Sequence, residues 1–394
     1  MRTAQFPKGV WARVDKVLRK DIKDNLNLPI EASNEYIYGQ RRLGCCGIPI
    51  AAEESDINLV DTAFKLLTSR DDICAREAFS SLVSTVHKRL GRLPDDDTLG
   101  AFLSGEVEGE FSTTSNRYSN TWTVARVASR RLGICWTFED SSPSLSFADL
   151  TLKANSRRKI LFSIRDRLRT VRSTALLQKE NQGKSMEVVS LSPASSHFIS
   201  NGAYTRFADW RFVHRARLNL VPLNGAKPWL KDVNKRHNAI VDRLHKAQTT
   251  KGEVLSANQA VLGITIRPDL VFKKGREIFL IDVTCPFENR KTTFDSARTR
   301  KRTPRTPHII PILVGARGSW DPQNDSFLRR FMSCSYLNTF RKLCVSDSIK
   351  LSRDIYIDFL TAHKQYSTSE DTCNDPSDLA DIPSSIESQF VSPV

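Results

Sequence analysis

The stretch that decides the fold is RPDLVFKKGREIFLIDVT, which runs from Arg267 to Thr284. Two apolar runs with the composition of β-strands flank a short charged turn around Gly275, and this order predicts a β-hairpin. Each run carries one aspartate, and thirteen positions separate Asp269 from Asp282. If the strands pair in the expected register, the two carboxylates converge.

The period of a strand divides the second run into two faces. Asp282 and Thr284 fall on one face, and Ile281 and Val283 fall on the other. Two unrelated strand aspartates are the plainer interpretation of the pair, but a carboxylate between buried apolar residues is costly without a partner. That cost favours a metal site. Two aspartates accept a hard cation such as Mg²⁺ or Mn²⁺ and leave positions for water and a phosphate oxygen.

The segments around the hairpin predict an α/β domain over residues 236–366. A helix precedes the hairpin, a helix and a strand follow it, and two more helices close the domain. The predicted elements are a helix from Arg236, strands at 254–261, 264–272 and 278–285, a helix at 289–302, a strand at 309–314, and helices at 325–343 and 348–363.

The chain before this domain is predicted to be mainly helical. A helical region covers residues 1–110, and a polar, turn-rich stretch at 105–115 indicates its boundary. Residues 111–235 form a basic region with helices at 122–132 and 153–172 and a predicted loop at 182–195. The last segment, 367–394, is rich in Ser, Asp and Pro and is predicted to be disordered.

The charge of the chain points to nucleic acid. Of 394 residues, 59 are Lys or Arg, and the net charge is +15. Six acids and no Lys or Arg lie in 367–394, so the rest of the chain carries about +21. An anionic membrane is the weaker choice because the sequence has no lipidation motif and no long amphipathic anchor. The candidates for phosphate contact are Arg157, Arg158, Lys159, Arg165, Arg169, Arg172, Arg215, Arg217, Arg298 and Arg300. The alternative interpretation of these cations is an ordinary solvated helix surface.

Other sequence features narrow the class of protein. No apolar run approaches the length of a membrane span and no signal-peptide core follows the first residues, so we expect a soluble, unsecreted chain. The eight cysteines form no CxxC pair and no set at zinc-ligand spacing, which predicts reduced structural thiols and no zinc site. Cys285 is expected to be a core residue and not a nucleophile. His237 and His245 are eight apart, too far for a metal pair at adjacent helical turns.

Metal-binding acids in a basic chain predict a nuclease. Such a site needs a cation beside the attacking water, and restriction-type sites carry it two residues after the second acid, where this chain has Thr284. Lys301 on the following helix can replace it, and Lys291 is the second candidate. Glu288 keeps two interpretations, either a further metal ligand or outer partner, or an acid at a helix N-terminus.

An ordered series of motifs resembles one family. The C-terminal domain is similar to the restriction-like endonuclease domain of site-specific non-LTR retrotransposon polyproteins. Upstream motifs resemble the thumb-like segment just after the reverse-transcriptase palm. The matching residues are ASNEY 32–36, GIP 47–49, AFKLLTS 63–69, RPD 267–269, DVTCPFE 282–288, AR 297–298, Lys301, VGARGSWDP 314–322, VSD 345–347 and SRDIY 352–356.

The resemblance implies a PD-(D/E)XK-type nuclease with its lysine displaced onto a helix. Asp269, Asp282 and Lys301 fall on the family's catalytic positions, and Glu288 on a recurrent acid. Such a nuclease uses Mg²⁺ or Mn²⁺ and nicks target DNA in the nucleus to prime reverse transcription of the element RNA, so DNA and RNA are the implied partners. The parent polyprotein would also be an RNA-directed DNA polymerase.

The chain departs from that family in two places. It has no Tyr-x-Asp-Asp polymerase motif, so we expect a fragment that does not polymerise. Only residues 225–235 stand where the family carries a zinc knuckle, so the knuckle is predicted to be deleted. A catalytically silent nucleic-acid-binding remnant is therefore the alternative function, and a nuclease of another cellular role, such as repair, is a third.

Overall fold

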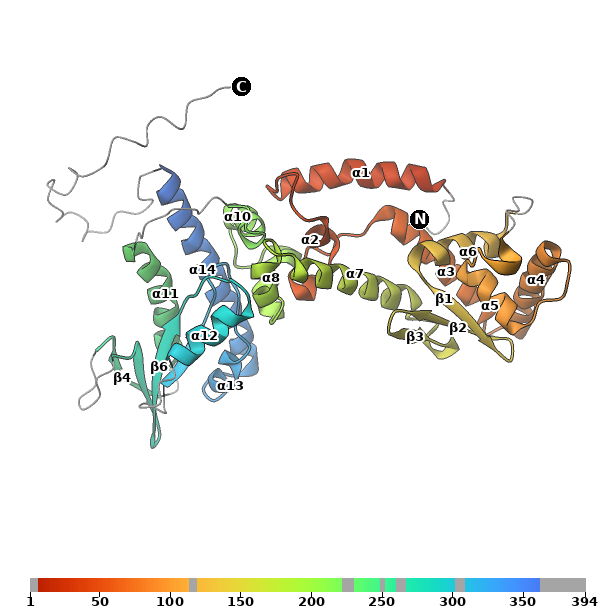
Figure 1. Ribbon diagram of the computed structural model, residues 1–394. Coiled ribbons are helices and arrows are strands. Elements are labelled where there is room, and N and C mark those ends of the chain that lie inside the picture. Colours follow the sequence, from red (N-terminus) through yellow and green to blue (C-terminus); the bar gives the residue numbers. More distant parts are fainter. Residues whose placement is uncertain are drawn as a thin grey trace, which may run out of the picture.

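The computed structural model describes residues 6–112, 119–221, 230–248, 252–259, 267–301 and 309–361. Figure 1 shows two lobes, with the long helix α7 (Ile160–Gln178) running from one toward the other. Both lobes mix helices with a small sheet, so the chain is an α/β protein. The sequence predicts strands for the C-terminal domain, whereas the sheet of the N-terminal lobe lies in a region predicted to be mainly helical. Within the described segments, no helix combines the length and apolar character that crossing a bilayer requires. The predicted disordered tail and residues 225–229 of the predicted knuckle deletion lie outside the described residues.

The N-terminal lobe is a helical bundle closed by a small antiparallel sheet. Asp or Asn side chains cap several of these helices; Asn120, for example, forms a capping box with Thr123. The elements are α1 (Lys8–Asn25), α2 (Asn34–Tyr38), α3 (Ala51–Leu67), α4 (Asp72–Leu90), α5 (Asp96–Ser104), α6 (Thr121–Leu132), β1 (Cys135–Glu139), β2 (Ser142–Phe147) and β3 (Leu150–Leu152).

One core crosses the boundary predicted near residue 110. Buried apolar residues from Ile57 to Ile164 form one continuous cluster that includes α6 and the three strands. The described part of the polar stretch, residues 105–112, therefore connects packed helices and does not separate two cores. The polar residues of this connection are exposed to water, and a polar connection does not show whether the helices on either side share one core.

Four helices connect the lobes: α7, α8 (Gly183–Val189), α9 (Phe198–Asn201) and α10 (Phe207–Arg217). The prediction of a loop at 182–195 is wrong, because this segment contains α8, which buries Met186, Val188 and Val189. These apolar side chains occupy a segment too short for a clear helical period, so its many polar residues dominated the prediction. The second half of this region also packs into the C-terminal core, through Phe198 and Val213.

The C-terminal lobe contains the predicted hairpin. Its sheet has the strand order β4-β5-β6-β7, with the first three strands antiparallel and β7 parallel to β6. The elements are α11 (Leu230–Gln248), β4 (Glu253–Ala257), β5 (Leu270–Lys274), β6 (Glu277–Thr284), α12 (Lys291–Lys301), β7 (Ile309–Leu313), α13 (Asn324–Leu328) and α14 (Cys334–Thr361).

The two helices predicted at 325–343 and 348–363 are arranged differently. A short α13 precedes one long helix, α14, which runs without a break through the proposed gap. No Gly or Pro stands in that gap, and Val345 and Ser346 are buried against the core. Burial of these residues is compatible with a continuous helix, so the polar residues around them did not mark an end.

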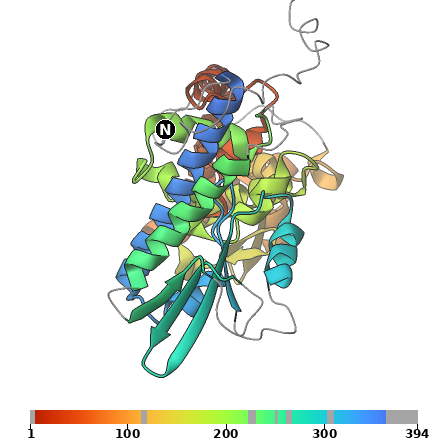
Figure 2. The same ribbon diagram turned by 90° about the vertical axis from the view of Figure 1, so that its left-hand side faces the viewer.

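Helices cover both faces of this sheet. Figure 2 shows α11 and α14 side by side on one face and α12 on the other. Ile281 and Val283 of β6 belong to the large core beneath α11 and α14, whereas Leu280 packs with Val271 and Ile309 on the opposite face. The alternation predicted for this strand is confirmed, and it leaves Asp282 on the face of Leu280.

Candidate metal centre on the hairpin

The register of the hairpin brings the two aspartates together. Leu270 pairs with Ile281 across the antiparallel strands, so the next position places Asp269 opposite Asp282. Directly opposed residues of an antiparallel pair project to the same side of the sheet. Both side chains are largely buried, with residue exposures of 8% for Asp269 and 9% for Asp282. The convergence predicted from the sequence is confirmed.

Asp269 is held by two donors. Its Oδ2 atom accepts a hydrogen bond of 2.6 Å from the Val283 amide and one of 2.9 Å from His237 Nε2. Burial acts to raise the pKa of Asp269, but the bonds from His237 and Val283 outweigh burial and the net pKa is lowered. The side chain is therefore an oriented anion.

Asp282 is in a different electrostatic state. Lys301 Nζ lies 2.9 Å from each of its carboxylate oxygens. Burial, together with a smaller contribution from the neighbouring Asp269, raises the pKa of Asp282 to about 6 despite this ammonium group. Two carboxylates in one buried place repel each other, so a cation bound between them would stabilise the charged form of both.

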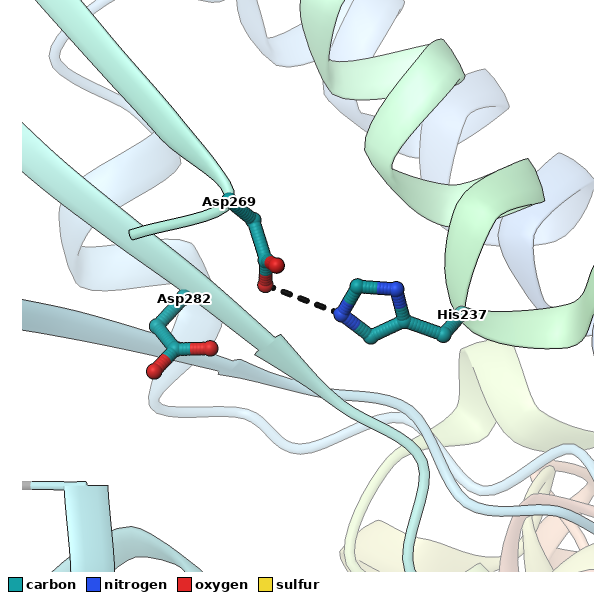
Figure 3. Close-up of side chains that lie close together, drawn as sticks. All are labelled: His237, Asp269 and Asp282. Atoms are coloured by element: carbon teal, nitrogen blue, oxygen red, sulfur yellow. Dashed lines mark hydrogen bonds and ion pairs between the residues drawn. The ribbon is translucent and has the colours of Figure 1, made fainter. Parts of the chain in front are cut away.

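His237 joins the acids from the other side. Nitrogen and oxygen atoms of His237, Asp269 and Asp282 that could ligate a metal all lie within 4.8 Å of one another. Figure 3 shows the imidazole on α11 directed toward the two strand carboxylates. Sequence reasoning considered His237 only as a partner for His245 on the same helix. The true neighbour lies 32 positions away in sequence, and helical spacing carries no signal for such a contact.

The structure separates the two candidate lysines. Lys301 is the last residue of α12, and its contact with Asp282 agrees with the position predicted for it. Lys291 is the first residue of the same helix, about 15 Å away along the axis, and it is exposed. Thr284, which stands where a lysine was expected, has a buried Oγ1 atom without a hydrogen-bond partner among the described residues.

Glu288 has a structural role, which corrects its interpretation as a metal ligand or helix-terminal acid. The side chain is 1% exposed. Its oxygens accept hydrogen bonds from the amides of Arg317 and Ser319 and from the Ser319 hydroxyl, at 2.8 to 3.2 Å. A Cβ atom on Gly315 would lie only 2.1 Å from Glu288 Oε1. Glu288 therefore shapes the 315–319 loop.

Two of the predicted phosphate-binding cations are in the interior. Arg217 has no exposed surface and donates to the carbonyls of Ser195 and Gly318 at 2.5 and 3.2 Å. Arg298 is buried and forms an ion pair with Asp321. Both predictions are corrected. The periodicity of a charged helix does not show which of its cations the fold will bury against distant acceptors.

The other predicted cations differ in how they are paired. Arg165 donates to both oxygens of Glu54, at 2.6 and 2.5 Å, and Arg172 forms a two-pronged contact with Glu53. Arg158 and Lys159, before α7, are exposed. The remaining candidates stay predictions for nucleic-acid contact: Arg157, which donates to the Lys65 carbonyl, Arg169, Arg215, which donates to the Leu220 carbonyl, and Arg300, which is exposed beside Lys301.

Cys285, which follows β6, is a further reactive group close in sequence to Asp282. Burial raises the pKa of its thiol to about 11, which keeps it protonated at neutral pH. The side chain packs at the margin of the large core. The prediction of a core residue is confirmed.

Comparison of the chain with protein-family models gives no match, and comparison with curated proteins gives none either. The likeness to retrotransposon endonucleases therefore rests on the sequence motifs described above.

Proposed function

We propose that the chain is a metal-dependent DNA endonuclease with its reaction centre at Asp269, Asp282 and Lys301. The observation that carries the proposal is the convergence of two buried carboxylates from adjacent strands, with an ammonium group at hydrogen-bond distance from the second. In a strongly basic chain this arrangement suits hydrolysis of a polyanion.

The residues at the centre fit a divalent cation. Asp269 and Asp282 would hold it, since their oxygens face one buried place and repel each other without a cation. Thr284 Oγ1, which has no hydrogen-bond partner within the described segments, lies on the same strand face as Asp282 and adds a polar atom to the site. A bound divalent cation would activate a water molecule and neutralise charge on the scissile phosphate.

Each side chain has a separate task in this proposal. The Val283 amide and His237 fix the direction of the Asp269 carboxylate. Lys301 reaches the site from α12, on the face of the sheet opposite to α11 and α14, and its ammonium group can orient water and stabilise negative charge on the phosphate. Exposed cations near the centre, Arg300 among them, would attract the DNA backbone.

The motif resemblance supports a more specific role, in which the nuclease is a PD-(D/E)XK-type fragment of a non-LTR retrotransposon polyprotein. In that role it nicks chromosomal DNA in the nucleus to prime reverse transcription of the element RNA, so target DNA and element RNA are its partners. The expected cofactor is Mg²⁺ or Mn²⁺ because carboxylates prefer such hard ions.

A plasmid-nicking assay tests the proposal. Supercoiled DNA is incubated with the full chain in Mg²⁺ or Mn²⁺, and the Asp269→Asn and Asp282→Asn variants are compared with Asp242→Asn, an exposed acid on α11. We expect nicking by wild type and by the control variant, and a loss of about 100-fold or more in the two site variants. Equal nicking by all four proteins would remove the proposal.

A catalytically silent nucleic-acid-binding protein is the second candidate. It is favoured by Thr284 in place of the expected lysine and by the commitment of Glu288 to the 315–319 loop. This candidate predicts DNA binding that weakens steeply with salt and no cleavage in either metal. Metal-dependent nicking that requires Asp282 would exclude it.

A further inference from the structure

We propose that His237 is a direct nitrogen ligand of the cation, so that the site prefers a divalent transition-metal ion such as Mn²⁺ to Mg²⁺. The inference deepens the proposed function, since it rests on the cation site formed by Asp269 and Asp282. It replaces a site of oxygen ligands alone by a mixed site of one imidazole and two carboxylates.

The first support is the position of the imidazole. His237 Nε2 is 2.9 Å from Asp269 Oδ2, and the potential ligand atoms of the three residues lie within 4.8 Å of one another. These separations are close to those between ligands that share one metal ion, because bonds of about 2.0 to 2.2 Å from one ion to each ligand span up to about 4 Å. A small movement of side chains is enough to place one ion among them.

The second support is the other ring nitrogen. His237 Nδ1 lies 3.1 Å from Asn238 Oδ1, so the oxygen can accept the Nδ1 proton. Metal-ligating histidines commonly donate their distal N–H to an oxygen, which fixes the ring and directs the other nitrogen to the metal. When the ion binds, the proton on Nε2 passes to solvent, and the Nε2 lone pair and the Asp269 carboxylate both face the metal.

The third support is the rigid mounting of this part of α11. The adjacent Arg236 is buried; its Nη1 donates to Ser352 Oγ of α14 at 2.8 Å, and its guanidinium lies 5.5 Å from the centre of the Phe287 ring. Farther along α11, Arg243 Nη2 donates to Asp347 Oδ1 at 3.0 Å. Two contacts with α14 therefore fix the helix that presents the imidazole.

The ligand set decides the class of ion. Mg²⁺ prefers oxygen ligands in octahedral geometry, whereas an imidazole nitrogen binds transition metals more strongly. Mn²⁺ is the weakest binder of the first-row divalent series, so a preference for Mn²⁺ over Mg²⁺ is the most conservative sign of a nitrogen ligand. A site with only the two aspartates would show a smaller preference.

Metal titration of the full chain tests this inference without an activity measurement. Calorimetry with Mn²⁺ and with Mg²⁺ compares wild type with His237→Gln, which offers an oxygen in place of the nitrogen, and with the control His245→Gln on the same helix. We expect His237→Gln to weaken Mn²⁺ binding by about tenfold or more while Mg²⁺ binding changes less than about threefold. The control should match wild type for both ions.

Pulsed electron paramagnetic resonance supplies a direct signature. A ¹⁴N coupling to bound Mn²⁺ is expected in wild type and in His245→Gln, and its absence is expected in His237→Gln. The inference is overturned if the coupling persists in His237→Gln, if the ratio of Mn²⁺ to Mg²⁺ affinity does not change in that variant, or if wild type binds no Mn²⁺.

The inference and the proposed function can fail separately. Asp282-dependent nicking with the same metal preference in wild type and His237→Gln would remove the nitrogen ligand and leave the endonuclease. A His237-dependent ¹⁴N coupling in a protein that nicks DNA in neither metal would establish the ligand and remove the endonuclease. The Asp269→Asn and Asp282→Asn variants should lose binding of both ions in either case.

Discussion

Acids and cations meet in both lobes of the molecule, with opposite results. In the N-terminal lobe, Arg165 and Arg172 of α7 each reach one glutamate of α3, so every acid in these pairs has its own guanidinium. On the C-terminal hairpin, Asp269 and Asp282 share one buried place with a histidine and a lysine at its edge. The number of charged groups is similar in the two places. What differs is that the hairpin brings two like charges together, and this is the arrangement that calls for a further cation.

The largest effect is expected at Glu288, a buried acid of the C-terminal lobe that, unlike the two aspartates, has its own donors. Its side chain accepts hydrogen bonds from the 315–319 loop. Replacement by alanine should lower the free energy of unfolding by about 3 to 5 kcal/mol, since the amides of Arg317 and Ser319 and the buried Arg217 would lose an anion. Urea unfolding measures the effect. Unchanged stability together with loss of nicking would return Glu288 to the role of metal ligand.

The two lysines of α12 provide the next test. Lys301→Ala should reduce nicking by about 100-fold, or about 2.7 kcal/mol in activation free energy, because the ammonium beside Asp282 is removed. Lys291→Ala at the other end of the helix should retain wild-type nicking. Plasmid nicking at saturating metal checks both variants, and the reverse result would show that the contact between Lys301 and Asp282 is only structural.

His214 shows a third arrangement, in which a buried group avoids charge altogether. Its Nδ1 contacts the Tyr36 hydroxyl at 2.7 Å, and burial, assisted by the nearby Arg217, lowers its pKa to about 3. The pKa of His214 is lower in the folded chain than in the unfolded chain, so the free energy of unfolding decreases as the pH falls below 6.5. The decrease is about 1.4 kcal/mol per pH unit over the window from 6.5 toward 3.

The His214→Gln variant separates this titration from other groups. Glutamine can accept the Tyr36 hydrogen bond but does not titrate, so the slope of unfolding free energy against pH between 6.5 and 5 should decrease by about one proton. Urea unfolding at several pH values measures the slope, with His245→Gln as the matched control. An unchanged slope in His214→Gln would show that His214 is protonated in the folded chain.

The smallest effect is expected where cations are already paired. Arg165→Met should change affinity for duplex DNA less than about twofold, since Glu54 already engages this guanidinium. A combined Arg158→Ala and Lys159→Ala variant, which removes two exposed cations, should reduce the salt slope of DNA binding by up to about two. A larger loss in Arg165→Met than in the double variant would contradict the contrast between paired and exposed cations.

The sequence by itself determined the hairpin and its two carboxylates. Strand alternation has a period of two and the turn is short, so Asp269 and Asp282 had to lie opposite each other once the strands paired. The same reasoning placed a helix with a lysine after the second strand, although its contact with Asp282 depended on where that helix packs. Local backbone geometry is enough for relationships within one element or between strands joined by a tight turn.

Only the tertiary structure decided which distant residues complete the site and which leave it. His237 reaches Asp269 because α11 packs across the sheet, and Glu288 binds the 315–319 loop because that loop offers it donors. Arg217 was expected at the surface and is instead enclosed by carbonyl groups from segments far away in sequence. Such contacts depend on how whole elements pack, and the periodicity of one segment carries no information about the neighbour it will meet.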